Sequence, residues 1–136
     1  MIYLDTSATV KLVAAEEESA ALIDWLNAHP DENLVTSAVG HIELIRAATR
    51  IGPQAVALAR NVAATIDTLV LTDAIAAAAA TSSPAELRTL DAIHLATAHI
   101  HRKSLTAFCA YDRRLLGAAE SHGLPTVSPR GAADIS

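Results

Sequence analysis

The stretch that decides the fold is MIYLDTSATVKL (residues 1–12), at the start of the chain. Its residues 2–5, IYLD, predict a short buried strand that ends in an acid. The following TSATVKLVAA (residues 6–15) predicts a helix, with Thr6 or Ser7 as its cap. A strand, an acid and a helix in immediate succession are typical of a parallel sheet whose strands each lead into a helix.

The same order recurs along the rest of the 136 residues. Ser37 and Asp73 are the predicted caps of two further helices, and Pro53 suits the first position of another. The predicted helices are 18–28, 38–50, 53–65, 74–80, 86–103 and 112–123, and the further predicted strands are 34–36, 67–72, 105–111 and 125–128. This alternation predicts an α/β fold with a single domain over residues 1–136 and a loosely held tail at 129–136. Such sheets bind ligands beyond the carboxyl ends of their strands.

Composition narrows the class of protein. Hydrophobic residues make up 51% of the chain, enough for one sizeable core, but no apolar run approaches the roughly 20 residues that span a bilayer. The start of the chain does not resemble a signal peptide, and the single cysteine, Cys109, lies in an apolar run. We therefore expect a cytoplasmic protein without a membrane segment, with Cys109 in its core. The net charge of −5 disfavours a general nucleic-acid coat.

Four acids stand where a catalytic site is expected. Asp5 ends the first predicted strand, and Asp112 follows the fourth. Glu43 and Asp91 lie within the apolar stripes of two predicted helices, so both are expected to face the interior. The stripe around Asp91 consists of Leu87, Leu90, Leu95 and Ala98. Considered singly, Asp5 and Asp112 are equally explained as helix caps, and Glu43 as a boundary residue that reaches solvent.

Considered together, the four acids predict a cation site. Clustered carboxylates repel one another and take up protons unless a cation lies between them. A set of oxygen ligands alone suits Mg²⁺, or Mn²⁺ in its place. A divalent ion would then offset the charge of Asp91, and hydrolysis of phosphodiester bonds is the reaction that such a site serves best.

Four stretches follow one another along the chain: MIYLDTSATVKL (1–12), TSAVGHIELIRA (36–47), LRTLDAIHLATA (87–98) and YDRRLLGAAESHGLPTV (111–127). In these stretches and in their order the sequence resembles the PIN-domain ribonucleases, in particular the VapC-type toxins of bacterial type II toxin–antitoxin pairs. The resemblance implies a three-layer α/β/α sandwich around a mostly parallel sheet of four to five strands. It also implies an endoribonuclease that depends on Mg²⁺ or Mn²⁺, forms a homodimer and is neutralised by a small VapB-type antitoxin.

The resemblance also carries residue roles onto this chain. It implies a catalytic, metal-binding acidic cluster made of Asp5, Glu43, Asp91 and Asp112. Thr6 and Ser7 match the hydroxyl residues that follow the family's first acid, where they orient an acid or a water, or cap the helix. The family often has Thr or Ser where this chain has Ala110, and this departure leaves the role of Asp112 less defined.

Basic residues near the four acids offer phosphate contacts to an RNA strand. Arg46 and Arg113 are the principal candidates, since they follow two of the acids by three residues and by one residue. Further basic candidates are Arg50, Arg114, Arg102 and Lys103. The last two are equally explained as favourable charges at a helix C-terminus. With one Trp, one Phe and two Tyr in the chain, extensive stacking on bases is not expected.

Two further features have more than one interpretation. His94, three residues after Asp91, is either a packed core residue or a hydrogen-bond partner that supports this acid. Trp25, Leu22 and Leu26 suit either the core or an interface with another protein.

Two other functions that use an acid at the end of a strand require residues that this chain lacks at the expected positions. A phosphatase with Asp5 as its nucleophile would need an Asp two residues later, where Ser7 stands. A phospho-accepting receiver would need a Lys after a late strand, and residues 125–128 contain none. The remaining alternative is a catalytically inactive PIN-like or receiver-like Mg²⁺-binding module that acts through protein contacts.

Overall fold

One sheet of five parallel strands organises the computed structural model, which describes residues 1–131. Its order is β3-β2-β1-β4-β5, so β1 lies at the centre. The strands are β1 (Ile2–Leu4), β2 (Leu34–Ser37), β3 (Asp67–Leu69), β4 (Ala107–Cys109) and β5 (Thr126–Val127). The predicted α/β class and parallel sheet are confirmed. Residues 132–136 of the predicted tail lie outside the described residues.

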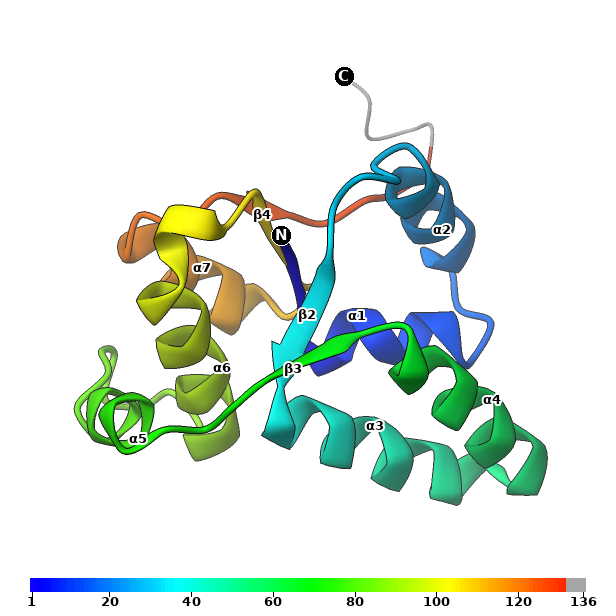
Figure 1. Cartoon of the computed structure of the whole chain (residues 1–136), viewed down its shortest axis with the longest axis horizontal. Coiled ribbons are helices and arrows are strands. Elements are labelled where there is room, and N and C mark those ends of the chain that lie inside the picture. Colours follow the sequence, from blue (N-terminus) through cyan, green and yellow to red (C-terminus); the bar gives the residue numbers. More distant parts are fainter. Residues whose placement is uncertain (132–136) are drawn as a thin grey trace.

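Helices follow the strands and cover both faces of the sheet, as Figure 1 shows, with α6 and α7 on one side and α1 and α2 on the other. The α-helices are α1 (Thr6–Thr9), α2 (Ser19–Asn27), α3 (Ala38–Ile51), α4 (Pro53–Ala64), α5 (Asp73–Ala80), α6 (Thr89–Ile100) and α7 (Arg113–Ser121). Two 3-10 turns continue α1 and α6, at η1 (Val10–Leu12) and η2 (Arg102–Ser104). The result is the three-layer sandwich that the resemblance implied.

Alternate side chains of the central strands pack into two separate cores, because successive residues of a strand point to opposite faces. Tyr3 and Phe108 face α6 and α7 and are fully buried with Leu95 and Leu115. The opposite face buries a second cluster that includes Ile2, Leu4, Ala8, Leu22, Ile66 and Cys109. Cys109 is therefore a core residue, as expected. This packing fixes the central strands from both sides.

The aromatic and leucine side chains of α2 belong to that second core. Leu22 is fully buried, and Trp25 and Leu26 are partly buried against the same cluster. The core interpretation of these three residues is the one that the structure supports. None of the helices within residues 1–131 is both long and apolar enough to cross a membrane.

Several predicted helix starts are wrong by one or more residues. The helix predicted over 86–103 begins only at Thr89, and Leu90 in its first turn is 45% exposed rather than part of a buried stripe. The cap of α5 is Thr72, whose hydroxyl accepts from the Ile75 amide at 3.2 Å, so Asp73 is the first helical residue. Likewise Asp5, rather than Thr6 or Ser7, caps α1. In α1 and α5 the residue just before the predicted cap already has the extended conformation that a cap requires, whereas in α6 the extended residue is Arg88, two residues after the predicted start.

Candidate active site

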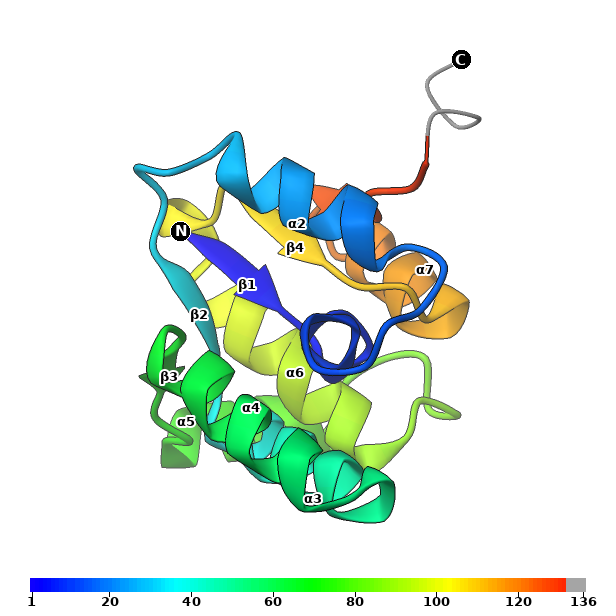
Figure 2. The ribbon, with the colours of Figure 1, turned by 90° about the vertical axis from the view of Figure 1, so that its right-hand side faces the viewer.

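The carboxyl ends of β1 and β4 bring Asp5 and Asp112 to the same edge of the sheet. The two strands run in parallel, with Leu4 paired to Cys109, and Figure 2 shows them side by side, leading towards α1 and α7. The Asp5 amide extends the ladder by donating to the Cys109 carbonyl at 3.0 Å. Asp5 itself is only 4% exposed. The rule that chemistry gathers beyond the carboxyl ends of parallel strands therefore holds for these two acids.

Both acids cap helices, and each does so through one carboxylate oxygen. Asp5 Oδ2 accepts from the Ser7 amide at 3.2 Å and from the Ser7 hydroxyl at 2.6 Å. Asp112 Oδ1 accepts from the amides of Arg114 and Leu115 at 2.9 and 3.1 Å. The capping interpretation is thus correct for both acids. The second carboxylate oxygen of each acid takes no part in capping and can bind other groups. Backbone amides orient Asp112, so the hydroxyl that Ala110 lacks is not needed to hold it.

Glu43, on α3, is joined to Asp5 by a buried histidine. His94 Nε2 lies 2.6 Å from Glu43 Oε1 and 3.5 Å from Asp5 Oδ1. The Thr6 hydroxyl donates to the same Glu43 oxygen at 2.7 Å. Burial opposes ionisation of Glu43, but the hydrogen bonds from His94 and Thr6 outweigh it, so the pKa of Glu43 lies below its ordinary value. Thr6 and Ser7 therefore each hold one acid of the site.

The acid partners of His94 differ from the one that the sequence suggested. His94 is fully buried, as the core interpretation expected, and it hydrogen-bonds Glu43 rather than Asp91. Burial disfavours its charged form, yet the bond to Glu43 and the charge of Asp5 raise the pKa of His94 above its ordinary value. Its second ring nitrogen, Nδ1, lies 2.6 Å from the Tyr3 hydroxyl. No sequence motif indicates that Tyr3 is part of the site.

Arg88 joins the other two acids. Its Nε lies 3.0 Å from Asp91 Oδ2, and its Nη2 lies 3.2 Å from Asp112 Oδ2. The sequence predicted a divalent cation as the charge that offsets Asp91, and the counter-charge seen here is this guanidinium. Sequence reasoning missed Arg88, although its position three residues before Asp91 is a spacing at which opposite charges meet near a helix start.

The two pairs of acids lie within electrostatic reach of each other. Burial raises the pKa of Asp91 above its ordinary value; Arg88 opposes this rise, and the charges of Asp5 and Asp112 add to it. The charge of Asp91 in turn acts on His94, which holds Glu43. We call these four acids the acidic cluster: Asp5 and Glu43 meet through His94, Asp91 and Asp112 meet through Arg88, and the charges of the two pairs act on each other.

The donor chemistry of this cluster fits a hard divalent cation, since every acidic donor is a carboxylate oxygen. Among residues 1–131 no hydrogen bond reaches Glu43 Oε2 or Asp91 Oδ1, so both are available as ligands. As they stand, no three acid, His or Cys side chains in this part of the chain are grouped as ligands of one ion. Arg88 lies between two of the acids, Asp91 and Asp112, and pairs with both.

Two of the hollows that border the acidic cluster contain basic residues singled out in the sequence. One of about 810 Å³ is lined by Asp91, Arg88, Arg113 and Arg114 beside apolar residues of α7. The other, of about 390 Å³, lies beside Glu43 and has these charged or exposed apolar residues in its wall: Arg46, Arg50, Ile42 and Leu90. Four of the basic residues singled out in the sequence thus border the acids.

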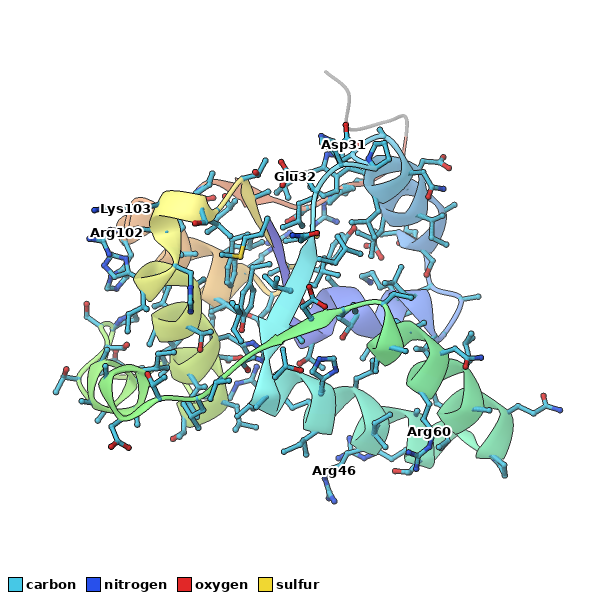
Figure 3. All side chains as sticks on the ribbon, viewed as in Figure 1. Asp31, Glu32, Arg46, Arg60, Arg102 and Lys103 are labelled. Atoms are coloured by element: carbon cyan, nitrogen blue, oxygen red, sulfur yellow. The ribbon has the colours of Figure 1, made fainter. Side chains whose placement is uncertain are left out.

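Arg102 and Lys103 lie elsewhere. They follow α6 at the end opposite to Asp91, and Figure 3 shows them far from Arg46. Arg102 donates to the His99 carbonyl at 3.0 Å, the helix-end role that was the alternative to RNA contact.

Comparison with known proteins agrees with this fold. The family model described as PIN domain matches residues 2–126. Ribonuclease VapC47 of Mycobacterium tuberculosis is 44% identical over 95% of this chain and 97% of its own, and ribonuclease VapC46 of the same species is 41% identical over 94% and 97%. The solved structure of M. tuberculosis VapC20, described as a toxin that cleaves the sarcin–ricin loop, superposes with a TM-score of 0.74 at 18% identity and covers 95% of this chain and 100% of that one. FitAB bound to a DNA fragment gives 0.70 at 19% identity and 95% coverage of both chains.

The chain therefore belongs to the PIN-domain family, and within it to the VapC-type ribonuclease toxins of toxin–antitoxin systems.

Replacing Arg88 with Gln tests the pairing across the site. We expect the pKa of Asp91 to rise further, because burial and the charges of Asp5 and Asp112 then act without the opposing guanidinium. Titration of side-chain carboxyl groups by ¹³C NMR in metal-free buffer measures this pKa. Arg88 is 72% exposed, so the free energy of unfolding should change by less than about 1 kcal/mol. Arg114→Gln, an exposed arginine of the same hollow, is the control, and an unmoved Asp91 pKa in Arg88→Gln contradicts the pairing.

Proposed function

We propose that this protein is an endoribonuclease that depends on Mg²⁺, with Mn²⁺ able to substitute, and hydrolyses RNA phosphodiester bonds. The observation that carries this proposal is the gathering of Asp5, Glu43, Asp91 and Asp112 at one edge of the sheet. Carboxylates gathered at one edge of a sheet repel one another, and divalent cations relieve that repulsion. The relatives named as ribonucleases supply the substrate class.

The same four acids are the proposed metal ligands. When bound there, a divalent ion supplies positive charge to the transition state and lowers the pKa of a water. The chain's own part is to hold the ligands in place: Ser7 fixes Asp5, and Thr6 fixes Glu43. Asp91 lies in the first turn of α6 and is partly buried, so its charge interacts strongly with any cation beside it.

Cleavage of RNA in the presence and absence of metal tests this function. The purified protein is incubated with a sarcin–ricin hairpin, chosen because a structural neighbour is described as cleaving it, and with other structured RNAs. We expect cleavage with Mg²⁺ or Mn²⁺, none with EDTA, and a loss of at least about 100-fold in Asp5→Asn and Asp91→Asn, because each removes a ligand charge.

Asp24→Asn, an exposed acid on α2, is the matched control and should cleave like the unsubstituted protein. Cleavage that survives EDTA and both site substitutions overturns the metal mechanism. Metal binding without cleavage of any RNA favours the inactive module that acts through protein contacts.

The RNA strand is proposed to cross the acids from one hollow to the other, with Arg46 and Arg113 as phosphate contacts. We expect Arg46→Gln and Arg113→Gln each to raise KM for RNA about fivefold, the equivalent of about 1 kcal/mol, with little change in kcat. The salt dependence of KM should weaken in both variants, because fewer counterions are released on binding. Steady-state kinetics at several salt concentrations measures this, and Arg102→Gln is the control. Equal KM values in all variants would remove the phosphate path.

We also propose a homodimer, a small VapB-type antitoxin as the partner that neutralises the enzyme, and a cytoplasmic location. Exposed Ile42 and Leu90 beside the acids are apolar surface that a protein partner could cover. Light scattering should give twice the mass of one chain, and a complex of larger mass, without RNA cleavage, when the cognate antitoxin is co-expressed. A measured mass of one chain contradicts the homodimer. Full RNA cleavage by the complex contradicts neutralisation by the antitoxin.

A further inference from the structure

A buried chain of hydrogen bonds leads from the middle of the sheet to the acidic cluster. Tyr3 lies on β1, stacks on Phe108 with ring centroids 5.2 Å apart, and meets the edge of the His94 ring at 5.8 Å. Its hydroxyl lies 2.6 Å from His94 Nδ1, and His94 Nε2 lies 2.6 Å from Glu43 Oε1. Tyr3 and His94 are both fully buried. An imidazole this deep requires partners for both nitrogens, and it has them.

The partners determine where the ring carries its hydrogen. Nε2 faces the oxygens of Glu43 and Asp5, and an ionised carboxylate can only accept hydrogen bonds. Nε2 therefore carries a hydrogen in either protonation state of His94. Burial raises the pKa of the Tyr3 hydroxyl, which keeps its proton. Tyr3 thus fixes the ring from behind while Nε2–H points at the two carboxylates.

The backbone of α3 is shaped to admit this ring. Gly40 lies three residues before Glu43, on the same face of the helix. A Cβ added to Gly40 would lie 3.1 Å from His94 Cε1 and 2.3 Å from the Thr36 hydroxyl oxygen. The second distance is a steric clash, so a residue with a Cβ does not fit here without a shift of its neighbours. Glycine therefore lets α3 approach α6 closely enough for Glu43 to reach His94.

The donors leave one side of Glu43 open. His94 and Thr6 both bind Oε1, and Oε2 has no hydrogen-bond partner among the described residues. Asp5 Oδ1 lies within 3.5 Å of the same ring nitrogen, so His94 holds carboxylates from β1 and α3 beside each other. A leucine of similar size would fill the space without supplying the hydrogen that keeps the two acids together.

We propose that His94, braced by Tyr3, is a positioning residue that holds Glu43 beside Asp5 in the arrangement a divalent cation needs. This inference rests on the proposed function, since it assigns a role towards the metal of that site. It gives His94 a task distinct from core packing, and it gives the hydroxyl of Tyr3 a task distinct from the stacking of its ring.

The test is the affinity for Mn²⁺, measured by calorimetry and by electron paramagnetic resonance without RNA. Substituting groups that orient metal ligands typically weakens metal binding by roughly 10- to 100-fold. We expect that range for His94→Leu. His94→Gln, whose amide can donate from the place of Nε2, should recover part of the affinity. Tyr3→Phe removes only the hydroxyl and should weaken Mn²⁺ binding by several-fold.

Tyr111→Phe is the matched control for Tyr3→Phe. Its hydroxyl also makes a 2.6 Å hydrogen bond, to the Pro129 carbonyl, and has no contact with Glu43 or Asp5. Binding is measured on protein shown by circular dichroism to be folded. If His94→Leu does not fold, Tyr3→Phe and His94→Gln still decide the question. Mn²⁺ affinities of Tyr3→Phe and His94→Gln within twofold of the unsubstituted protein overturn the inference.

The two proposals can fail separately. If the unsubstituted chain binds Mn²⁺ and Asp91→Asn does not, the metal site is supported whatever the His94 and Tyr3 variants do. If the unsubstituted chain binds no Mn²⁺, the proposed metal dependence and this inference are both overturned. Loss of thermal stability in the variants with unchanged Mn²⁺ affinity assigns His94 to the core alone and contradicts the positioning role.

Discussion

The parallel hydrogen bonding between β1 and β4 is the interaction on which the rest of the site depends. It pairs Tyr3 with Phe108 and Leu4 with Cys109, and it ends at the bond from the Asp5 amide to the Cys109 carbonyl. Because side chains alternate along a strand, a shift of β1 by one residue would turn Tyr3 to the opposite core and take Asp5 away from the edge. The same register thus places the Asp5 carboxylate at the edge of the sheet and the Tyr3 hydroxyl behind His94.

Charge repulsion within the cluster is relieved by donors that the protein itself supplies. Ser7 serves Asp5, Thr6 and His94 serve Glu43, and Arg88 serves the remaining two acids. Hydrogen bonds to the charged form favour that form, which explains the lowered pKa of Glu43. Asp91 shows the opposite shift, since burial affects it more than its single arginine can offset. The protein's own donors thus offset much of the repulsion among the four acids, and Asp91 is the acid whose charge they offset least.

Features that depend on local sequence were predictable, and those that depend on contacts between distant segments were not. The strand-ending acids at 5 and 112 follow from a general rule about parallel sheets, and the helix-borne acids at 43 and 91 from their spacing among apolar residues. The link between Tyr3, His94 and Glu43 joins residues 91 and 51 positions apart, so only the strand register and the approach of α3 to α6 reveal it. Leu90 was wrongly predicted to be buried for a related reason. The spacing of apolar residues indicates which helix face is apolar, but not how far the neighbouring element extends to cover it.

The carboxylate of Asp112 takes part in two interactions, the cap of α7 and the ion pair with Arg88. One oxygen is anchored by the amides that begin α7, and the other is shared with Arg88. Among residues 1–131 no backbone amide donates to the Asp91 carboxylate, so a change of its partner has no direct effect on a backbone N–H group. The two oxygens of Asp112 share one delocalised charge. A group that replaces Arg88 at Oδ2 therefore also changes the charge on Oδ1, to which the amides of Arg114 and Leu115 donate. The backbone N–H groups of residues 114 and 115 are thus natural reporters of occupancy at the site, readable in solution without any label.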